Sequence, residues 1–214
     1  MKWLIHLENY NISFNTSFLK KEDYILTRKY IDHYKIIYIV NGFMQANQVF
    51  TNGEIICHKL LYKSNAFINI EPYIYSKNQT DINYYYNIKA LTDTTIIIID
   101  PKEFIQKLKN NTELLYTIIY LHHDKNQDIV RILSHKGTKK RLVQFLLIMI
   151  ENFGRLTEQK IIIPFNLSHY NIGTIIGSQR ITVNKIMNNL KKNNVINYNE
   201  KEMIILNLTK LIQL

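Results

Sequence analysis

The 214-residue sequence predicts an α+β fold, with an all-β N-terminal domain, a long helix and a C-terminal winged helix-turn-helix. Three observations support this prediction. Short β-rich runs fill residues 35–100, helical spacing begins after Pro101, and two short amphipathic helices followed by a hairpin pattern occupy residues 168–207. Strands and helices are therefore segregated along the chain, as in α+β proteins.

The predicted β domain consists of four runs rich in Ile and Tyr. Turn signals at Asn41-Gly42 and Asn52-Gly53 separate them, as expected for an antiparallel sandwich or barrel. The runs are KIIYIV (35–40), EIICHKL (54–60), INYYYNIKAL (82–91) and TTIIIID (94–100).

A longer helix is predicted to begin near Thr112, which suits an N-cap. One stripe of this helix has spacings of 3, 4, 3, 4 and 3, which is the pattern of a coiled-coil seam. Its members are Leu115, Ile118, His122, Lys125, Ile129 and Ile132. A seam of this kind pairs most simply with its own copy, so we expect a homodimer. The polar pair His122 and Lys125 either extends outward from a packed stripe or lines a ligand pocket beside it.

Two short helices joined by a glycine follow an apolar helix (139–154) that ends at Gly154. Ser168 suits the N-cap of the first short helix, and Gly177-Ser178 suits the turn into the second. The second helix has an apolar face, composed of Val183, Ile186, Met187 and Leu190.

Polar side chains lie off that apolar face, near the start of the second helix. They are Gln179, Arg180, Thr182 and Lys185. Side chains of these types hydrogen-bond base edges when a recognition helix enters the major groove. The runs 195–199 and 202–207 then predict a hairpin, which would be the wing.

The positive charge is concentrated in the same region. Residues 136–214 hold 12 Lys and Arg against 4 Asp and Glu, a net charge of +8, whereas residues 1–135 have a net charge of +2. This asymmetry indicates a module that binds a polyanion, most commonly double-stranded DNA, attached to a near-neutral domain.

Other classes of function find little support in the sequence. No apolar run is long enough for a membrane span, the N-terminus lacks the features of a secretory signal, and the single Cys57 suits a reducing compartment. No catalytic triad or metal-ligand spacing is recognisable, so we expect neither an enzyme nor a metal protein. The 37 Ile and 25 Asn against 3 Ala indicate an AT-rich genome such as that of an organelle.

The segments RLVQFLLIMIENFG (141–154) and LSHYNIGTIIGSQRITVNKIMNNLK (167–191) resemble the Crp/Fnr superfamily of transcription regulators, in particular its nitrogen-control branch in cyanobacteria and plastids. The resemblance implies a β-roll of the cyclic-nucleotide-binding, jelly-roll type (1–110), a dimerisation helix (111–135) and a winged helix-turn-helix DNA-binding domain (136–214). It also implies that the residues at the positions of Arg180 and Lys185 read bases. Those at Ser168, His169, Ser178 and Gln179 would lie near the phosphate backbone.

The resemblance also implies an effector site for 2-oxoglutarate, whose two carboxylates need cationic partners. The matching positions are the cradle Phe67, Ile68, Asn69 and Ile70, the strand position Tyr84, and His122 or Lys125 on the helix with Gln127 as neighbour. This chain lacks the glycine of the cradle and has the neutral Tyr84 in place of an arginine. We therefore expect 2-oxoglutarate to bind weakly or not at all.

Together these features predict a homodimeric, sequence-specific transcription regulator, and the resemblance implies a nitrogen-related role and a palindromic GTA/TAC-type site. Its expected partners are DNA, its own copy and a bacterial-type RNA polymerase, with no membrane. The expected location is the plastid (chloroplast) stroma, or otherwise the bacterial cytoplasm. The alternative is a β-roll ligand-binding or scaffold protein whose degenerate helix-turn-helix no longer reads DNA, because Gly173 weakens its first helix.

Overall fold

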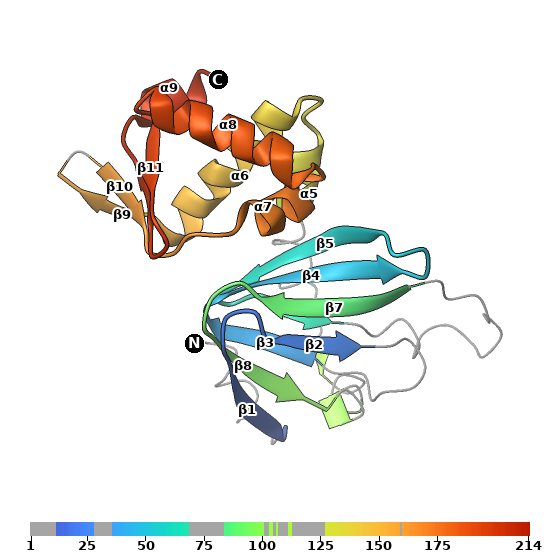
Figure 1. Cartoon of the computed structure of the whole chain (residues 1–214). Coiled ribbons are helices and arrows are strands. Elements are labelled where there is room, and N and C mark those ends of the chain that lie inside the picture. The colour runs from blue at the N-terminus through green and yellow to red at the C-terminus, as the bar shows by residue number, and fades with distance from the viewer. Residues whose placement is uncertain are drawn as a thin grey trace. The chain divides into compact units, whose positions relative to one another are not determined.

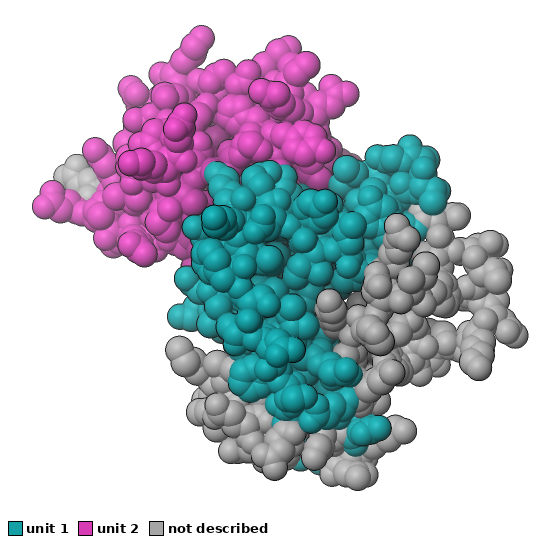
Figure 2. All heavy atoms as spheres, turned by 60° about the horizontal axis from the view of Figure 1, so that its bottom comes forward, with its two compact units in different colours: residues 1–127 teal, residues 128–214 magenta. Residues whose placement is uncertain are grey.

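The computed structural model divides the chain into two compact units, residues 1–127 and residues 128–214 (Figure 2). It describes residues 12–27, 36–68, 84–100, 103–104, 106, 111–112, 127–158 and 160–214. Antiparallel sheets form the first unit, and helices with a small sheet form the second (Figure 1). The predicted α+β class is confirmed.

The first unit is a roll of two 4-stranded antiparallel sheets. One sheet has the order β1 (Phe14–Leu19), β8 (Thr94–Ile99), β3 (Ile36–Asn41), β6 (Ala66–Ile68). The other has the order β2 (Tyr24–Thr27), β7 (Tyr84–Ala90), β4 (Phe43–Phe50), β5 (Ile55–Tyr62). The sequence had not predicted β1, β2, β4 or β6 as strands.

The core of the roll lies between these sheets. Alternate residues of β3 and β8 meet alternate residues of β4 and β7 there, because side chains on a strand point to opposite faces in turn. The buried members include Ile37, Ile39, Met44, Ala46, Leu61, Tyr86, Ile88 and Ile96. Gly42 makes the turn from β3 to β4 at φ +101°, where an added Cβ would lie 2.6 Å from the Asp93 carbonyl oxygen. Glycine is therefore required at this turn.

The second unit packs helices against a small sheet with the order β11-β12-β10-β9. Its elements are α5 (Gln127–Leu133), α6 (Thr138–Phe153), β9 (Arg155–Thr157), β10 (Lys160–Ile163), α7 (His169–Ile176), α8 (Arg180–Lys192), β11 (Ile196–Tyr198), β12 (Met203–Ile205) and α9 (Leu208–Ile212). The predicted hairpin is thus β11 and β12, which pair antiparallel from Ile196 with Ile205 to Tyr198 with Met203.

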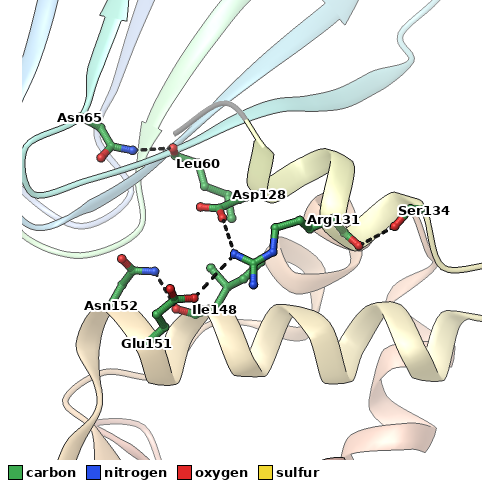
Figure 3. Close-up of polar contacts among 8 residues, drawn as sticks. All are labelled: Leu60, Asn65, Asp128, Arg131, Ser134, Ile148, Glu151 and Asn152. Carbon is green, nitrogen blue, oxygen red and sulfur yellow. Dashed lines mark hydrogen bonds and ion pairs between the residues drawn. The ribbon is translucent and has the colours of Figure 1, made fainter. Parts of the chain in front are cut away.

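Arg131 forms one ion pair within α5 and a second one with α6 (Figure 3). Arg131 Nη1 lies 3.6 Å from Asp128 Oδ1 on its own helix and 3.6 Å from Glu151 Oε2 on α6. Asp128 is buried, whereas Arg131 and Glu151 are largely exposed. The Arg131 guanidinium therefore compensates a buried carboxylate and ties α5 to α6.

The predicted seam reaches α5 at its C-terminal end. Ile129 and Ile132 are 8% and 0% exposed, so both are buried within the chain itself. The exposed apolar residues of α5 are Val130, at 68%, and Leu133, at 37%. Leu115, Ile118, His122 and Lys125 lie outside the described residues. No helix in the described part of the chain is long and apolar enough to cross a membrane.

Candidate nucleic-acid interface

Helix α7 begins at a side-chain cap, as the sequence predicted. Ser168 has extended backbone angles, and its Oγ accepts a hydrogen bond of 3.1 Å from the Asn171 backbone N–H. This bond satisfies one of the free N–H groups at the helix start. His169 follows as the first helical residue and is partly buried.

The turn between α7 and α8 depends on two glycines. Gly177 ends α7 in the left-handed region, at φ 63° and ψ 50°, which glycine adopts without a Cβ clash. Gly173 lies one turn earlier, where an added Cβ would be 2.6 Å from the Ser178 carbonyl oxygen. The Ser178 N–H also donates to the Gly173 carbonyl at 2.8 Å. Gly173 therefore lets the turn close against α7.

Arg141 of α6 donates hydrogen bonds to two backbone carbonyl groups, one of them at the end of α7 beside this turn. Its Nε donates to the His135 carbonyl at 2.7 Å, and its Nη1 donates to the Ile176 carbonyl at 3.4 Å. Ile176 is the last residue of α7, so the guanidinium satisfies a carbonyl that the helix leaves open. Nothing in the local sequence links Arg141 to the turn, so its role could not be predicted from the sequence.

Helix α8 has one buried and one exposed face. Val183, Met187 and Leu190 are at most 2% exposed, whereas the predicted apolar residue Ile186 is only partly buried. The exposed face presents Gln179, Arg180, Ile181, Asn184 and Lys185, with Ser178 and Thr182 partly buried beside it. The structure thus brings the predicted polar residues of the turn and helix together on one surface.

His169 lies beside this exposed face. Burial of the ring and the positive charge of Arg180 hold the pKa of His169 below its ordinary value of 6.5, although a hydrogen bond with Asn184 acts in the opposite direction. At neutral pH the imidazole is therefore mainly uncharged. His169, at the start of α7, thus interacts with two side chains of α8, those of Arg180 and Asn184.

The wing is fixed to the helices by Tyr198, a residue that the sequence analysis treated only as part of a hairpin. Its ring packs edge-on against His169 with centroids 5.8 Å apart, and Lys191 Nζ lies 4.8 Å from its ring centre. Its hydroxyl hydrogen-bonds to Asn188 Oδ1 at 3.2 Å. Burial raises the pKa of this hydroxyl, so it stays protonated and can donate. One side chain therefore connects β11, α7 and α8.

A further set of hydrogen bonds orders the turn of the wing. Asn166 Nδ2 donates to the Asn199 carbonyl at 2.7 Å, and Asn199 Oδ1 accepts from the backbone N–H groups of Lys201 and Glu202. The charged tip of the wing is thus ordered by its own asparagine side chain.

A shallow hollow lies on the basic side of α8. It is lined by Lys139 from the start of α6 and by Lys185, Ile186, Asn189 and Leu190. The hollow places a lysine of α6 near a lysine of the recognition helix. Two lysines around one hollow favour contact with a polyanion.

The predicted effector residues are only partly described. Phe67 is 3% exposed and its ring packs against Tyr86, with centroids 5.1 Å apart. Tyr84 packs against the same ring at 5.5 Å. Phe67 of the predicted cradle and Tyr84, the predicted strand position, therefore both pack against Tyr86. Ile68 packs partly buried on the other face of β6.

The other effector predictions are not brought into this group. Gln127 is the exposed first residue of α5. Asn69, Ile70, His122 and Lys125 lie outside the described residues. Within the described ranges no cluster of three or more His, Cys, Asp or Glu could hold a metal ion. Burial raises the pKa of the Cys57 thiol to about 12, which leaves it unreactive.

Comparisons with known proteins agree with this architecture. Residues 140–214 match the family described as a Crp-like helix-turn-helix domain. A global nitrogen regulator from Nostoc sp. is 26% identical over 174 residues, covering 80% of this chain and 76% of that protein. The HTH-type transcriptional regulator ycf28 of Porphyra purpurea is 24% identical over 206 residues, covering 95% of this chain and 83% of that protein.

The fold has close counterparts among solved structures. FixK2 from Bradyrhizobium japonicum superposes with a TM-score of 0.74 at 13% identity, covering 95% of this chain and 98% of that one. The exposed polar face of α8 is typical of a helix-turn-helix. The matched family and the similar regulators indicate the same kind of domain. Residues 140–214 are therefore a Crp-like helix-turn-helix domain, and the chain is similar to transcription regulators of the Crp/Fnr type, the global nitrogen regulators among them.

Proposed function

We propose that the protein is a homodimeric, sequence-specific regulator of nitrogen-related genes that binds a palindromic GTA/TAC-type site. The observation that carries this proposal is the exposed face of α8, where Arg180, Ile181 and Lys185 project from the start of a recognition helix. Regulators of this type place that end of the helix in the major groove.

Each residue of the face has a chemical role in this proposal. Arg180 donates two hydrogen bonds to O6 and N7 of the half-site guanine, which is the commonest specific contact in DNA recognition. Ile181, 65% exposed, contacts the methyl group of the neighbouring thymine. Lys185 and Thr182 contact bases further along the groove.

The residues around the start of the helices bind the phosphate backbone. They are Ser168, His169, Ser178 and Gln179. Their roles are to position the helix, since phosphate contacts fix the register without reading sequence. Lys139, in the hollow beside Lys185, adds a cation to this rim.

A two-fold dimer presents its two recognition helices roughly 34 Å apart, one turn of the DNA helix. We place the protein in a plastid or a bacterial cytoplasm, with a bacterial-type RNA polymerase as its partner. The biased composition and the relative from Porphyra purpurea support the plastid. The scaffold alternative loses its main argument, because Gly173 fits the turn that it permits.

The test is a fluorescence-anisotropy titration of the full chain against a GTA/TAC palindrome and a scrambled duplex, each at two salt concentrations. We expect tighter binding to the palindrome, by about a thousandfold or more, and a steep loss of affinity with salt. Equal affinity for both duplexes would leave only non-specific binding, and no binding to either would favour the scaffold alternative.

A further inference from the structure

Helix α8 presents an exposed asparagine among the residues that are proposed to read bases. Asn184 lies one helical turn after Arg180, so the two exposed side chains project from the same side of the recognition helix. An asparagine amide has one acceptor oxygen and two N–H donors. What Asn184 offers to DNA therefore depends on which of these groups are already bonded within the protein.

The oxygen of this amide is already bonded. Asn188 Nδ2, one further turn along the helix, donates to Asn184 Oδ1 at 3.0 Å. Burial and Arg180 lower the pKa of His169, but its hydrogen bond with Asn184 acts to raise it, as expected when an imidazole N–H donates to a carbonyl oxygen. Asn184 Oδ1 therefore accepts from two side chains, which occupies both of its lone pairs.

The nitrogen of the same amide is available. Asn184 Nδ2 has no acceptor among the residues that the structure describes, and its side chain is exposed. Turning the amide over would break both bonds of the oxygen, so the N–H groups stay directed away from Asn188 and His169. Asn184 is thus held as a donor, whereas an unbonded asparagine offers a donor and an acceptor together.

A group that only donates distinguishes the bases in the major groove. Guanine presents the acceptors O6 and N7 and thymine presents O4, whereas cytosine presents only the N4 donor. Adenine presents a donor and an acceptor side by side, and an unbonded asparagine pairs with both. Because its oxygen is occupied, Asn184 loses that double contact with adenine. It therefore favours guanine and thymine and disfavours cytosine.

We propose that Asn184 is a specificity-determining residue of the recognition helix and that Asn188 is the positioning residue that keeps it a donor. Asn184 Nδ2 donates to a guanine or thymine within about two base pairs of the guanine that Arg180 reads, since residues one turn apart lie about 5 to 6 Å apart and base pairs about 3.4 Å. Asn188 acts through Asn184 and needs no contact with DNA. This inference rests on the proposed function, because it assumes that α8 enters the major groove.

The bond between the two asparagines matters most when DNA is bound. Asn184 and Asn188 are both exposed, so water competes with their hydrogen bond in the free protein and the bond is weak. DNA displaces this water, and a hydrogen bond is stronger where the local dielectric is low. The orientation of the Asn184 amide is therefore held most firmly at the moment when the base is read.

The experiment measures base preference with the full chain and a pool of DNA duplexes in which the half-sites and their flanks have random bases. Duplexes that the wild type binds are separated by mobility shift and sequenced. The same selection with Arg180→Ala identifies the guanine that Arg180 reads. Within about two base pairs of it, we expect one position at which guanine or thymine exceeds cytosine by roughly 2- to 10-fold, as for one hydrogen bond.

Asn184→Asp reverses the chemistry of the side chain and keeps the bonds of its oxygen. The carboxylate still accepts from Asn188 and His169, but it now presents an acceptor to the DNA, which suits the N4 donor of cytosine. Total affinity should fall because of the added negative charge. The ratio of cytosine to guanine and thymine at this position should nevertheless rise by roughly 10- to 100-fold.

Asn197→Asp on β11 is the matched control. Asn197 is also exposed, and its Oδ1 also accepts a hydrogen bond, from the Tyr198 backbone N–H at 2.9 Å. The same change of charge there should leave every base preference as in the wild type. Circular dichroism checks that each variant is folded.

Asn188→Ala tests the positioning role separately. With one of its two bonds removed, the Asn184 amide is free to turn over and to pair with N6 and N7 of adenine. The share of adenine at the same position should rise by roughly 2- to 10-fold. A residue that only stabilises the helix would lower affinity for all duplexes and leave this share unchanged, and that result would exclude Asn188 as a positioning residue.

The outcomes separate this inference from the proposed function. If Asn184→Asp keeps the wild-type preferences and loses affinity for all duplexes alike, Asn184 does not read a base and the inference is wrong, although sequence-specific recognition stands. A wild type that selects no sequence would refute sequence-specific recognition and the role of Asn184 together. Selection of a palindrome other than GTA/TAC would refute only the proposed site, because the position beside the Arg180 contact is still compared between variants.

Discussion

The Tyr198 ring of the wing packs edge-on against the His169 ring of α7, with centroids 5.8 Å apart and an interplanar angle of 79°. The same tyrosine lies beside Lys191 and bonds to Asn188 of α8. Tyr198 therefore connects the wing to both helices of the motif, and a substitution at Tyr198 should change DNA binding.

We expect Tyr198→Ala to weaken binding to every duplex alike, by about 1 to 2 kcal/mol, because the freed wing and His169 lose their positions on the phosphate backbone. Tyr198→Phe keeps the ring and removes only the bond to Asn188, so its effect should be smaller. Anisotropy titrations against the palindrome and the scrambled duplex measure both. A loss confined to the palindrome would show that Tyr198 acts on base recognition instead.

The stability of the second unit should depend on pH through His169. The folded pKa lies below the ordinary value of 6.5, so the unfolded chain binds the proton more readily. The stabilisation from the neutral ring is fully present above pH 6.5 and declines as the pH falls below that value. Denaturant unfolding of the wild type and of His169→Gln, from pH 8 to pH 5, measures this. Identical profiles for the two proteins would contradict it.

DNA binding should have the opposite dependence on pH. A phosphate beside His169 favours the charged ring and offsets the effect of Arg180, so binding takes up a proton. Affinity should therefore rise as the pH falls from about 8 to 6, and His169→Gln should remove the part due to this residue. A wild-type affinity that does not change over this range would place His169 away from the phosphates.

Gly173→Ala should destabilise the second unit, although alanine favours helices. The change gains about 1 kcal/mol of helix propensity, but its Cβ would meet the Ser178 carbonyl and force the turn apart, at a cost of about 1 to 3 kcal/mol. Thr174→Ala, next along the same helix, is the control and should change stability by less than about 0.5 kcal/mol. Thermal unfolding compares the two. A more stable Gly173→Ala protein would show that the turn has room for a side chain.

The dimer prediction concerns the exposed face of α5. Val130 is 68% exposed, and an apolar side chain beside a predicted seam is a candidate contact with a second copy. Analytical ultracentrifugation should show a dimer for the wild type and a weaker dimer for Val130→Glu, with the helical circular dichroism retained. Ile132→Glu is a different control, since it should unfold the unit in which this fully buried residue lies. A dimer of unchanged affinity in Val130→Glu would exclude this face.

Local signals in the sequence predicted much of the second unit. A serine cap, a left-handed glycine and an apolar spacing of three and four are each set by neighbouring residues, and they located α7, the turn and α8 correctly. The contacts of Tyr198 with His169 and of Arg141 with Ile176 join distant residues. No local pattern encodes these contacts, so the sequence did not reveal them.

Contacts between distant residues also explain why the sequence did not predict some features of the roll and the seam. Periodicity predicted an apolar stripe through Ile129 and Ile132 but could not tell whether the same chain or a second copy covers it. The charged side chain of Lys59 on β5 is buried, and its direction depends on the pairing of Lys59 with Ala46, next to an irregularity of register between Ala46 and Asn47. Such a shift moves side chains between the two faces of a strand, and no alternation in the sequence predicts where it occurs.

The most direct test of the central claim is the affinity of Arg180→Ala for the GTA/TAC palindrome, relative to duplexes in which the half-site guanine is replaced. The account predicts a loss of about 1 to 3 kcal/mol on the palindrome and nearly equal affinity for all the bases at that position, because the bidentate contact to guanine is gone. Lys201→Ala at the wing tip is the matched control and should keep the preference for guanine. If Arg180→Ala still discriminates guanine as the wild type does, Arg180 does not read the half-site, and this recognition mechanism is wrong.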